Sequence, residues 1–175
     1  MVSKVLFSSN KSDWETPPEL FDKLDKEFHF DLDICATNQN TKCVRFLSAN
    51  ALHPEVGWKV LSNRAIFMNP PYGRQVGQWV RKAYEESRKG ATVVCLLPSR
   101  TDVEWWHDFV IAGKAEVRFL RGRVRFLLDG VAMKAGAPFP SAVVIFRPPE
   151  EAENESVGSS RERVPSWQAS SPGSQ

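Results

Sequence analysis

Short apolar runs alternate with segments of helical periodicity over residues 1–147, and this alternation limits the possible fold more than any other feature. Helices are predicted over residues 17–28, 76–89 and from Thr101 to Gly113. Strands separated by helices predict an α/β fold with a mostly parallel sheet. Two strands close together near the end of the domain add an antiparallel hairpin at one edge. The predicted strands cover residues 30–34, 44–47, 65–68, 92–97, 115–120, 124–127 and 142–146.

Two of the predicted helices begin with the pattern of a capping box. Thr16-Pro17-Pro18-Glu19 has a threonine at the cap position, a glutamate three residues later and a proline at the first helical position. Thr101-Asp102-Val103-Glu104 repeats the pattern without the prolines. Both threonines are therefore expected to accept a hydrogen bond from the first turn of a helix.

Ligands of parallel α/β sheets bind beyond the carboxyl ends of the strands. Three polar or proline-containing segments follow predicted strands directly, at residues 33–36, 69–72 and 98–100. We expect these segments to meet at one edge of the sheet and to form the functional site.

The tetrapeptide Asn69-Pro70-Pro71-Tyr72 is the most informative of these segments. Its prolines fix φ and lack an N–H group, so they stiffen the loop. The Asn69 amide and the Pro70 carbonyl can then accept both hydrogens of an exocyclic amine, which localises the nitrogen lone pair for attack on an electrophilic methyl group. Tyr72 offers a flat face on which a base can stack.

The tetrapeptide resembles the amine-methylating motif of S-adenosylmethionine-dependent methyltransferases. Further segments with the same order resemble the phage-type DNA N-6-adenine methyltransferase (Dam) family, and the match runs from about Trp14 to Phe146. The resemblance implies a Rossmann-like class I methyltransferase fold and methyl transfer from S-adenosyl-L-methionine to the N6 amine of adenine in DNA, at a specific site. The supporting segments are WETPP (14–18), FDLDICA (30–36), LPSRTD (97–102) with Trp105 and Trp106, GRVRF (122–126) and PSA (140–142).

The resemblance also implies roles for single residues. The catalytic set is Asn69, Pro70, Pro71 and Tyr72, which would hold, orient and stack the adenine. Asn69 is neutral, so catalysis would rest on orientation and hydrogen bonding, with the proton lost to water. The chain lacks the glycine-rich loop after the first cofactor strand, and Asn50 stands where an acid usually binds the cofactor ribose. The expected cofactor-binding residues are Trp14, Thr16, Asp33, Cys35, Ala36 and Asn50.

DNA is the expected partner. Residues 1–147 carry a net charge of +5, and three arginines alternate with Gly122, Val124 and Phe126 so that they would line one face of a strand. Such a face suits contact with phosphates. The amine of a paired adenine is out of reach inside a duplex, so the target base must be flipped out or single-stranded. The three expected DNA-binding residues are Arg121, Arg123 and Arg125.

Composition excludes several classes of protein. The three cysteines and three histidines have no metal-ligand spacing, so no metal is expected. Neither a membrane-spanning run nor a secretion signal is found. We expect a cytoplasmic protein of a bacterial host, encoded by a phage or prophage with a restriction-modification or regulatory role, and a monomer or weak homodimer. A methyltransferase domain over 1–147 would precede a disordered C-terminal tail over 148–175, rich in Pro, Ser, Glu and Gly.

Alternative functions remain open on the motif alone. The same tetrapeptide serves N4-cytosine DNA methyltransferases, and close relatives of it serve protein-glutamine and RNA-guanine methyltransferases. The unusual cofactor segments would also fit a non-catalytic DNA-binding module with a degenerate methyltransferase fold.

Overall fold

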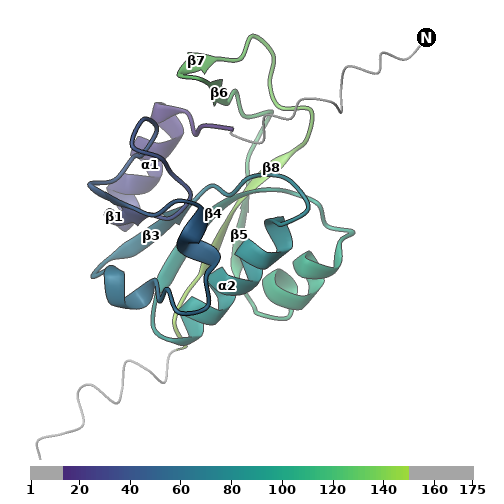
Figure 1. Ribbon diagram of the computed structural model, residues 1–175. Helices are drawn as coiled ribbons and strands as arrows, with labels where there is room; N and C mark the ends of the chain where they lie inside the picture. Colours follow the sequence, from purple (N-terminus) through teal and green to yellow (C-terminus); the bar gives the residue numbers. More distant parts are fainter. Residues whose placement is uncertain (1–13, 150–175) are drawn as a thin grey trace, which may run out of the picture.

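A six-stranded sheet forms the centre of the computed structural model, which describes residues 14–149 (Figure 1). The strand order is β2-β1-β3-β4-β8-β5; β1 to β4 are parallel, and β8 runs antiparallel to β4 and β5. The predicted α/β fold with a mostly parallel sheet is confirmed. The predicted tail lies outside the described residues from 150 on, so its boundary stays a prediction. The strands are β1 (Phe30–Asp33), β2 (Arg45–Phe46), β3 (Ala65–Met68), β4 (Thr92–Pro98), β5 (Glu116–Phe119) and β8 (Ser141–Phe146).

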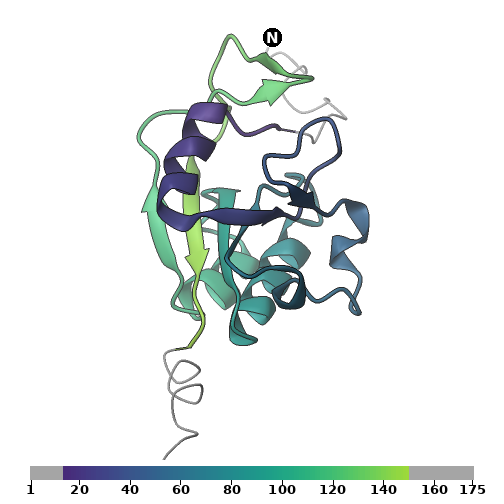
Figure 2. The same cartoon turned by 90° about the vertical axis from the view of Figure 1, so that its left-hand side faces the viewer.

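Helices cover both faces of the sheet, as Figure 2 shows. Alternate residues of β4 point to opposite faces. Val94 and Leu96 join the cluster that packs under α1 (Pro18–Phe28). Val93, Cys95 and Leu97 join the cluster under α2 (Val76–Arg88) and the π-helix η4 (Trp106–Ile111). No helix within residues 14–149 has the length and hydropathy of a membrane-spanning segment.

A buried carboxylate fixes the long connection between β2 and β3. This connection holds only the short 3-10 helices η2 (Ala49–Leu52) and η3 (Lys59–Leu61). Glu86 on α2 is 1% exposed and accepts the backbone N–H groups of Trp58 and Lys59 at 2.8 and 3.0 Å. It also accepts from Lys89 at 2.9 Å. The connection is therefore tied to α2 by hydrogen bonds that the low-dielectric interior strengthens.

The antiparallel edge differs from the prediction in its detail. β5 and β8 form it, although residues 120–140 separate them. The predicted strand 124–127 is wrong, because residues 121–126 have no strand structure and β6 begins only at Leu127. Gly122, with φ of +80°, turns the chain out of an extended path. The tight hairpin of β6 (Leu127–Leu128) and β7 (Val131–Ala132) stands off the end of the sheet (Figure 1).

Neither capping box forms as predicted. In α1 the N-cap is Pro17, no side chain caps the first turn, and Thr16 lies one residue outside the helix. In the third helix the regular turns start after Thr101, and the N-cap of η4 is Trp105, again without a side-chain cap. The Thr16 hydroxyl is therefore left for a different partner.

Candidate active site

A cavity of about 210 Å³ opens beyond the carboxyl ends of β1 and β3, where the sequence places the site. Asn69 and Pro71 line it, next to residues from the start of the described chain and from the loop after β1. The structure therefore brings together segments far apart in the sequence. Five of the six expected cofactor-binding residues line this cavity: Trp14, Thr16, Asp33, Cys35 and Ala36.

Asn69 follows the last residue of β3, and its amide group is held on one side only. The side-chain nitrogen Nδ2 donates to the Trp14 carbonyl oxygen at 2.5 Å and to Thr16 Oγ1 at 2.9 Å. The side-chain oxygen Oδ1 is buried and has no hydrogen-bond partner among the described residues. A buried unpaired acceptor costs about 1–3 kcal/mol. The site thus presents an acceptor ready for a donor that the protein itself does not supply.

The rest of the tetrapeptide is packed tightly. Pro70 is buried, and the Pro71 carbonyl accepts the N–H of Gly73 at 2.9 Å. The Tyr72 hydroxyl donates to the carbonyl of Leu96 on β4 at 2.9 Å. Burial raises the pKa of the Tyr72 phenol well above its ordinary value, so the group stays protonated and serves as an anchor.

Aromatic rings surround Tyr72. Phe126 and Phe139 meet its ring edge-on, with centroid distances of 5.8 and 5.4 Å, and both also contact Trp14 at 5.6 Å. Phe126 and Phe139 belong to the 120–140 connection. In this conformation the Tyr72 ring is therefore enclosed, and a base can stack on it only after the connection has shifted.

Asp33, the last residue of β1, supplies a buried carboxylate to the cavity. It is 4% exposed and accepts the N–H groups of Lys42 at 3.1 Å and Cys35 at 3.4 Å. Burial raises the pKa of Asp33, and the two backbone hydrogen bonds oppose this rise. Burial likewise raises the pKa of the Cys35 thiol, which keeps it neutral. Asp33 is thus the candidate partner for a positively charged group.

Sequence reasoning missed several residues of the cavity and misplaced one. Asn50 lies exposed in η2 and is not a lining residue, whereas Ser48, two residues earlier, is. Trp79 on α2 was expected only as a core residue, yet it lines the cavity, and its Nε1–H is buried without a partner among residues 14–149. The serine at the end of β2 was the available signal. The other lining residues that the sequence did not indicate are Thr37, Asn40 and Lys42.

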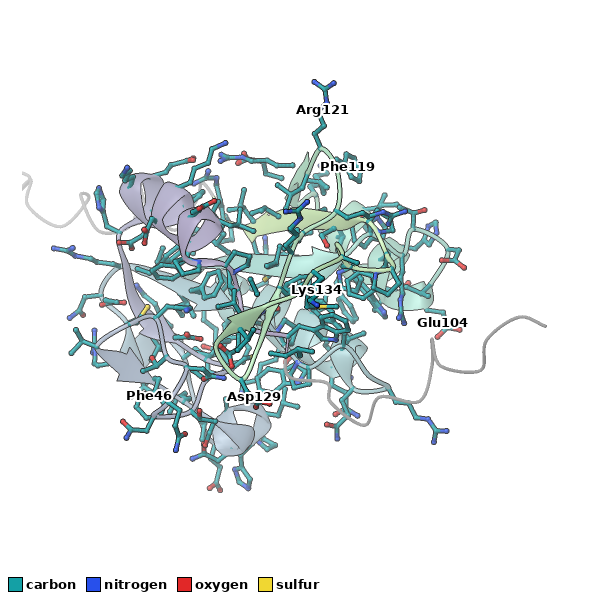
Figure 3. The ribbon with its side chains drawn as sticks, turned by 90° about the horizontal axis from the view of Figure 1, so that it is seen from above. Phe46, Glu104, Phe119, Arg121, Asp129 and Lys134 are labelled. Atoms are coloured by element: carbon teal, nitrogen blue, oxygen red, sulfur yellow. The ribbon has the colours of Figure 1, made fainter. Side chains whose placement is uncertain are left out.

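The three arginines predicted to contact DNA are exposed, but they do not share one face of a strand. They lie on the irregular segment 121–126, and Arg121 projects away from the body of the molecule (Figure 3). Gly136 packs against Arg123: an added Cβ would lie 2.4 Å from the Arg123 Cβ. This close approach folds the segment back on itself and fixes where its charges are displayed.

Comparison with known proteins identifies the family. The model of the family described as DNA N-6-adenine-methyltransferase (Dam) matches residues 3–167. The chain belongs to the Dam family. One relative of this Dam-family protein is the DNA N-6-adenine-methyltransferase of Haemophilus phage HP1 (strain HP1c1), 28% identical over 143 residues, which cover 80% of this chain and 81% of the relative. Another is the DNA N-6-adenine-methyltransferase of Escherichia phage T1, 30% identical over 118 residues, or 67% of this chain.

The resemblance predicted from the sequence is therefore confirmed. The Dam-family protein spans about half of the length of the T1 relative, of which the alignment covers 48%, and most of the HP1 relative. Membership supports adenine N6 methylation of DNA as its reaction and implies S-adenosylmethionine as methyl donor. Within residues 14–149, no cluster of three or more His, Cys, Asp or Glu side chains is placed to hold a metal ion.

Proposed function

We propose that this protein transfers a methyl group from S-adenosyl-L-methionine to the N6 amine of adenine at a specific site in DNA. The observation that carries the proposal is the Asn69 amide, whose nitrogen is bound by the protein while its oxygen is a buried acceptor without a partner. An exocyclic amine has the hydrogens that this oxygen lacks. Membership of the Dam family supports the choice of adenine as the base.

The cavity fits the cofactor through the chemistry of its lining. The buried Asp33 carboxylate would pair with the positively charged methionine portion, which offsets the cost of keeping a charge out of water. The unpaired Trp79 Nε1–H would find an acceptor, and Ser48 would bind the ribose in place of the expected Asn50. Cys35 and Ala36 leave room for the cofactor where other methyltransferases have glycines. The cofactor would supply the methyl group on its sulfonium centre.

The chain's own residues would act by orientation. Asn69 Oδ1 and the Pro70 carbonyl would accept the two amine hydrogens and so direct the nitrogen lone pair toward the methyl group. Neither group is a base, and the excess proton would leave to water after transfer. Holding both reactants in a reactive geometry is itself a large source of rate acceleration.

The target base must reach Asn69 from outside the duplex. We infer that the adenine is flipped out, or taken from a single strand, and that the 120–140 connection shifts so that Phe126 and Phe139 leave room beside Tyr72. The exposed arginines at 121, 123 and 125 would bind DNA phosphates from the same connection. The protein would act as a monomer or weak homodimer in the cytoplasm of the bacterial host.

Nucleoside mass spectrometry tests the proposal. Unmethylated DNA is incubated with the protein and S-adenosylmethionine, and the products are digested and analysed. N6-methyladenine is expected with the wild type and with Asn63→Ala, an exposed asparagine just before β3 at the opposite end of the sheet. Asn69→Ala should form none, while its cofactor affinity stays close to that of the wild type.

Other products decide between the alternatives. N4-methylcytosine would retain the mechanism and correct the base. No methylated nucleoside from DNA or RNA, together with no cofactor binding at millimolar concentration in calorimetry, would favour the non-catalytic DNA-binding module.

A further inference from the structure

We infer that Thr16 is a positioning residue for Asn69, and that with the Trp14 carbonyl it makes the site specific for an amide at position 69. This inference rests on the proposed function. The sequence assigns Thr16 two other roles, as a helix cap and as a cofactor contact. The structure contradicts the first, because α1 starts after Pro17 without a side-chain cap.

The orientation of the Asn69 amide follows from the chemistry of its neighbours. The two ends of an amide side chain are assigned from their hydrogen-bond partners. A peptide carbonyl can only accept, so the end of Asn69 that lies 2.5 Å from the Trp14 oxygen must be the nitrogen. Thr16 Oγ1 accepts the second hydrogen at 2.9 Å. Both donors of the amide are then used, and Oδ1 is turned to the remaining side.

Burial makes this arrangement effective. Thr16 is 3% exposed, so water does not compete freely for its hydroxyl. The segment that carries both acceptors is itself fixed, because Glu15 exchanges two backbone hydrogen bonds with Leu127, at 3.0 and 2.9 Å. The Glu15 carboxylate also accepts the N–H of Gly130 at 3.3 Å. Asn69 thus rests against a segment that the β6–β7 hairpin holds in place.

A carboxylate at position 69 does not fit this environment. An ionised aspartate has acceptors only, and one oxygen would face the Trp14 carbonyl oxygen. The Thr16 hydroxyl can reverse and donate, but the carbonyl cannot. A protonated aspartate, by contrast, donates one O–H and retains a carbonyl oxygen, which reproduces the amide. The structure therefore predicts that an aspartate here works only in its protonated form.

Three variants test the inference in the methylation assay with saturating cofactor. Thr16→Val keeps the shape and loses the acceptor, so kcat should fall about tenfold while the Kd for S-adenosylmethionine changes less than twofold. Thr16→Ser should restore kcat to within about twofold of the wild type. Thr92→Val, at the opposite end of β4, makes the same chemical change and should have no effect. Thermal melting identifies any variant that does not fold.

The pH profile of Asn69→Asp gives a readout that a structural role for Thr16 would not produce. Its kcat relative to the wild type should be lowest at high pH and should rise as the pH falls and the introduced carboxyl takes up a proton. A ratio that does not depend on pH would overturn the amide specificity. A Thr16→Val variant with weakened cofactor binding and unchanged kcat would overturn the positioning role and make Thr16 a cofactor contact.

A measurement without turnover separates this inference from the proposed function. In ¹⁵N–¹H NMR spectra the two Asn69 side-chain amide hydrogens should be protected from exchange in the wild type and in Thr16→Ser, and one should lose protection in Thr16→Val. If the wild type methylates nothing, the proposed function fails, and this experiment still decides on the hydrogen bonds. Equal protection in all three proteins would overturn the inference.

Discussion

Replacing Asp33 with asparagine should weaken cofactor binding without unfolding the protein. The carboxylate is buried at the cavity, and a hydrogen bond to a charged group contributes about 1.5–3 kcal/mol. Its loss corresponds to a rise in the Kd for S-adenosylmethionine of about 10- to 150-fold. The asparagine oxygen can still accept the Lys42 N–H, and only the longer bond from Cys35, at 3.4 Å, is lost. The free energy of unfolding without cofactor should therefore change by less than about 1 kcal/mol.

The pH dependence of the wild type should show two opposite effects of Asp33. Burial raises its pKa in the folded state, and folding therefore favours the protonated form. This contribution to stability is complete below the ordinary pKa of about 4 and is lost as the pH rises through the raised value. Cofactor affinity should increase over the same rise in pH, because the ionised carboxylate binds the cationic group. Asp33→Asn should remove both effects.

Isothermal titration calorimetry with S-adenosylmethionine, combined with urea unfolding, measures these quantities. Asp31→Asn is the matched control on the same strand. Partial burial raises the pKa of Asp31, but hydrogen bonds from Ser62 and Asn63 and the nearby Arg45 outweigh this and lower it overall. Asp31→Asn should therefore lose stability at neutral pH and keep its cofactor affinity. A Kd for Asp33→Asn within twofold of the wild type would refute the assigned role of Asp33.

Three further predictions follow from contacts around the site. Glu86→Ala should lower the free energy of unfolding by about 2–5 kcal/mol, because two backbone N–H groups lose their acceptor, whereas Glu86→Gln should cost less than half as much; equal losses in urea unfolding would contradict this. Ser48→Ala should raise the cofactor Kd about 3- to 10-fold and Asn50→Ala less than twofold in calorimetry, and the reverse order would return the ribose to Asn50. Replacing the exposed arginines with alanine should flatten the plot of log binding constant against log salt by up to about 0.9 per lost phosphate contact, and an unchanged slope would remove them from the DNA-binding surface: Arg121, Arg123 and Arg125.

The sequence predicted the sheet and the place of the site because these depend on local patterns. Apolar runs such as residues 65–68 and 92–97 mark buried strands whatever lies around them, and the ends of parallel strands meet at one edge. Asp33 and Asn69 follow or end such strands, so their proximity to one cavity could be predicted. The same reasoning placed Asn50 too far along, because the short β2 leaves Ser48 at the edge.

Features that depend on distant partners could not be predicted. The pattern of Thr16 fits a helix cap, and nothing nearby in the sequence shows that an amide 53 residues later competes for the hydroxyl. The enclosure of Tyr72 depends on Phe126 and Phe139, whose segment was predicted to continue as a strand. Gly122 was visible, but a glycine alone does not show that its φ is positive.

The bridge between Glu15 and Leu127 has a consequence for heat inactivation. The segment that orients Asn69 is joined to the hairpin by few hydrogen bonds, whereas β4 is paired along its length with β3 and β8. Local opening requires only the contacts of the segment that opens. Residues 14–16 can therefore detach while the sheet stays folded, and enzymatic activity should disappear on warming several degrees before the far-ultraviolet circular dichroism signal. Amide hydrogen exchange at Glu15 and Leu127 should accordingly be faster than in β4.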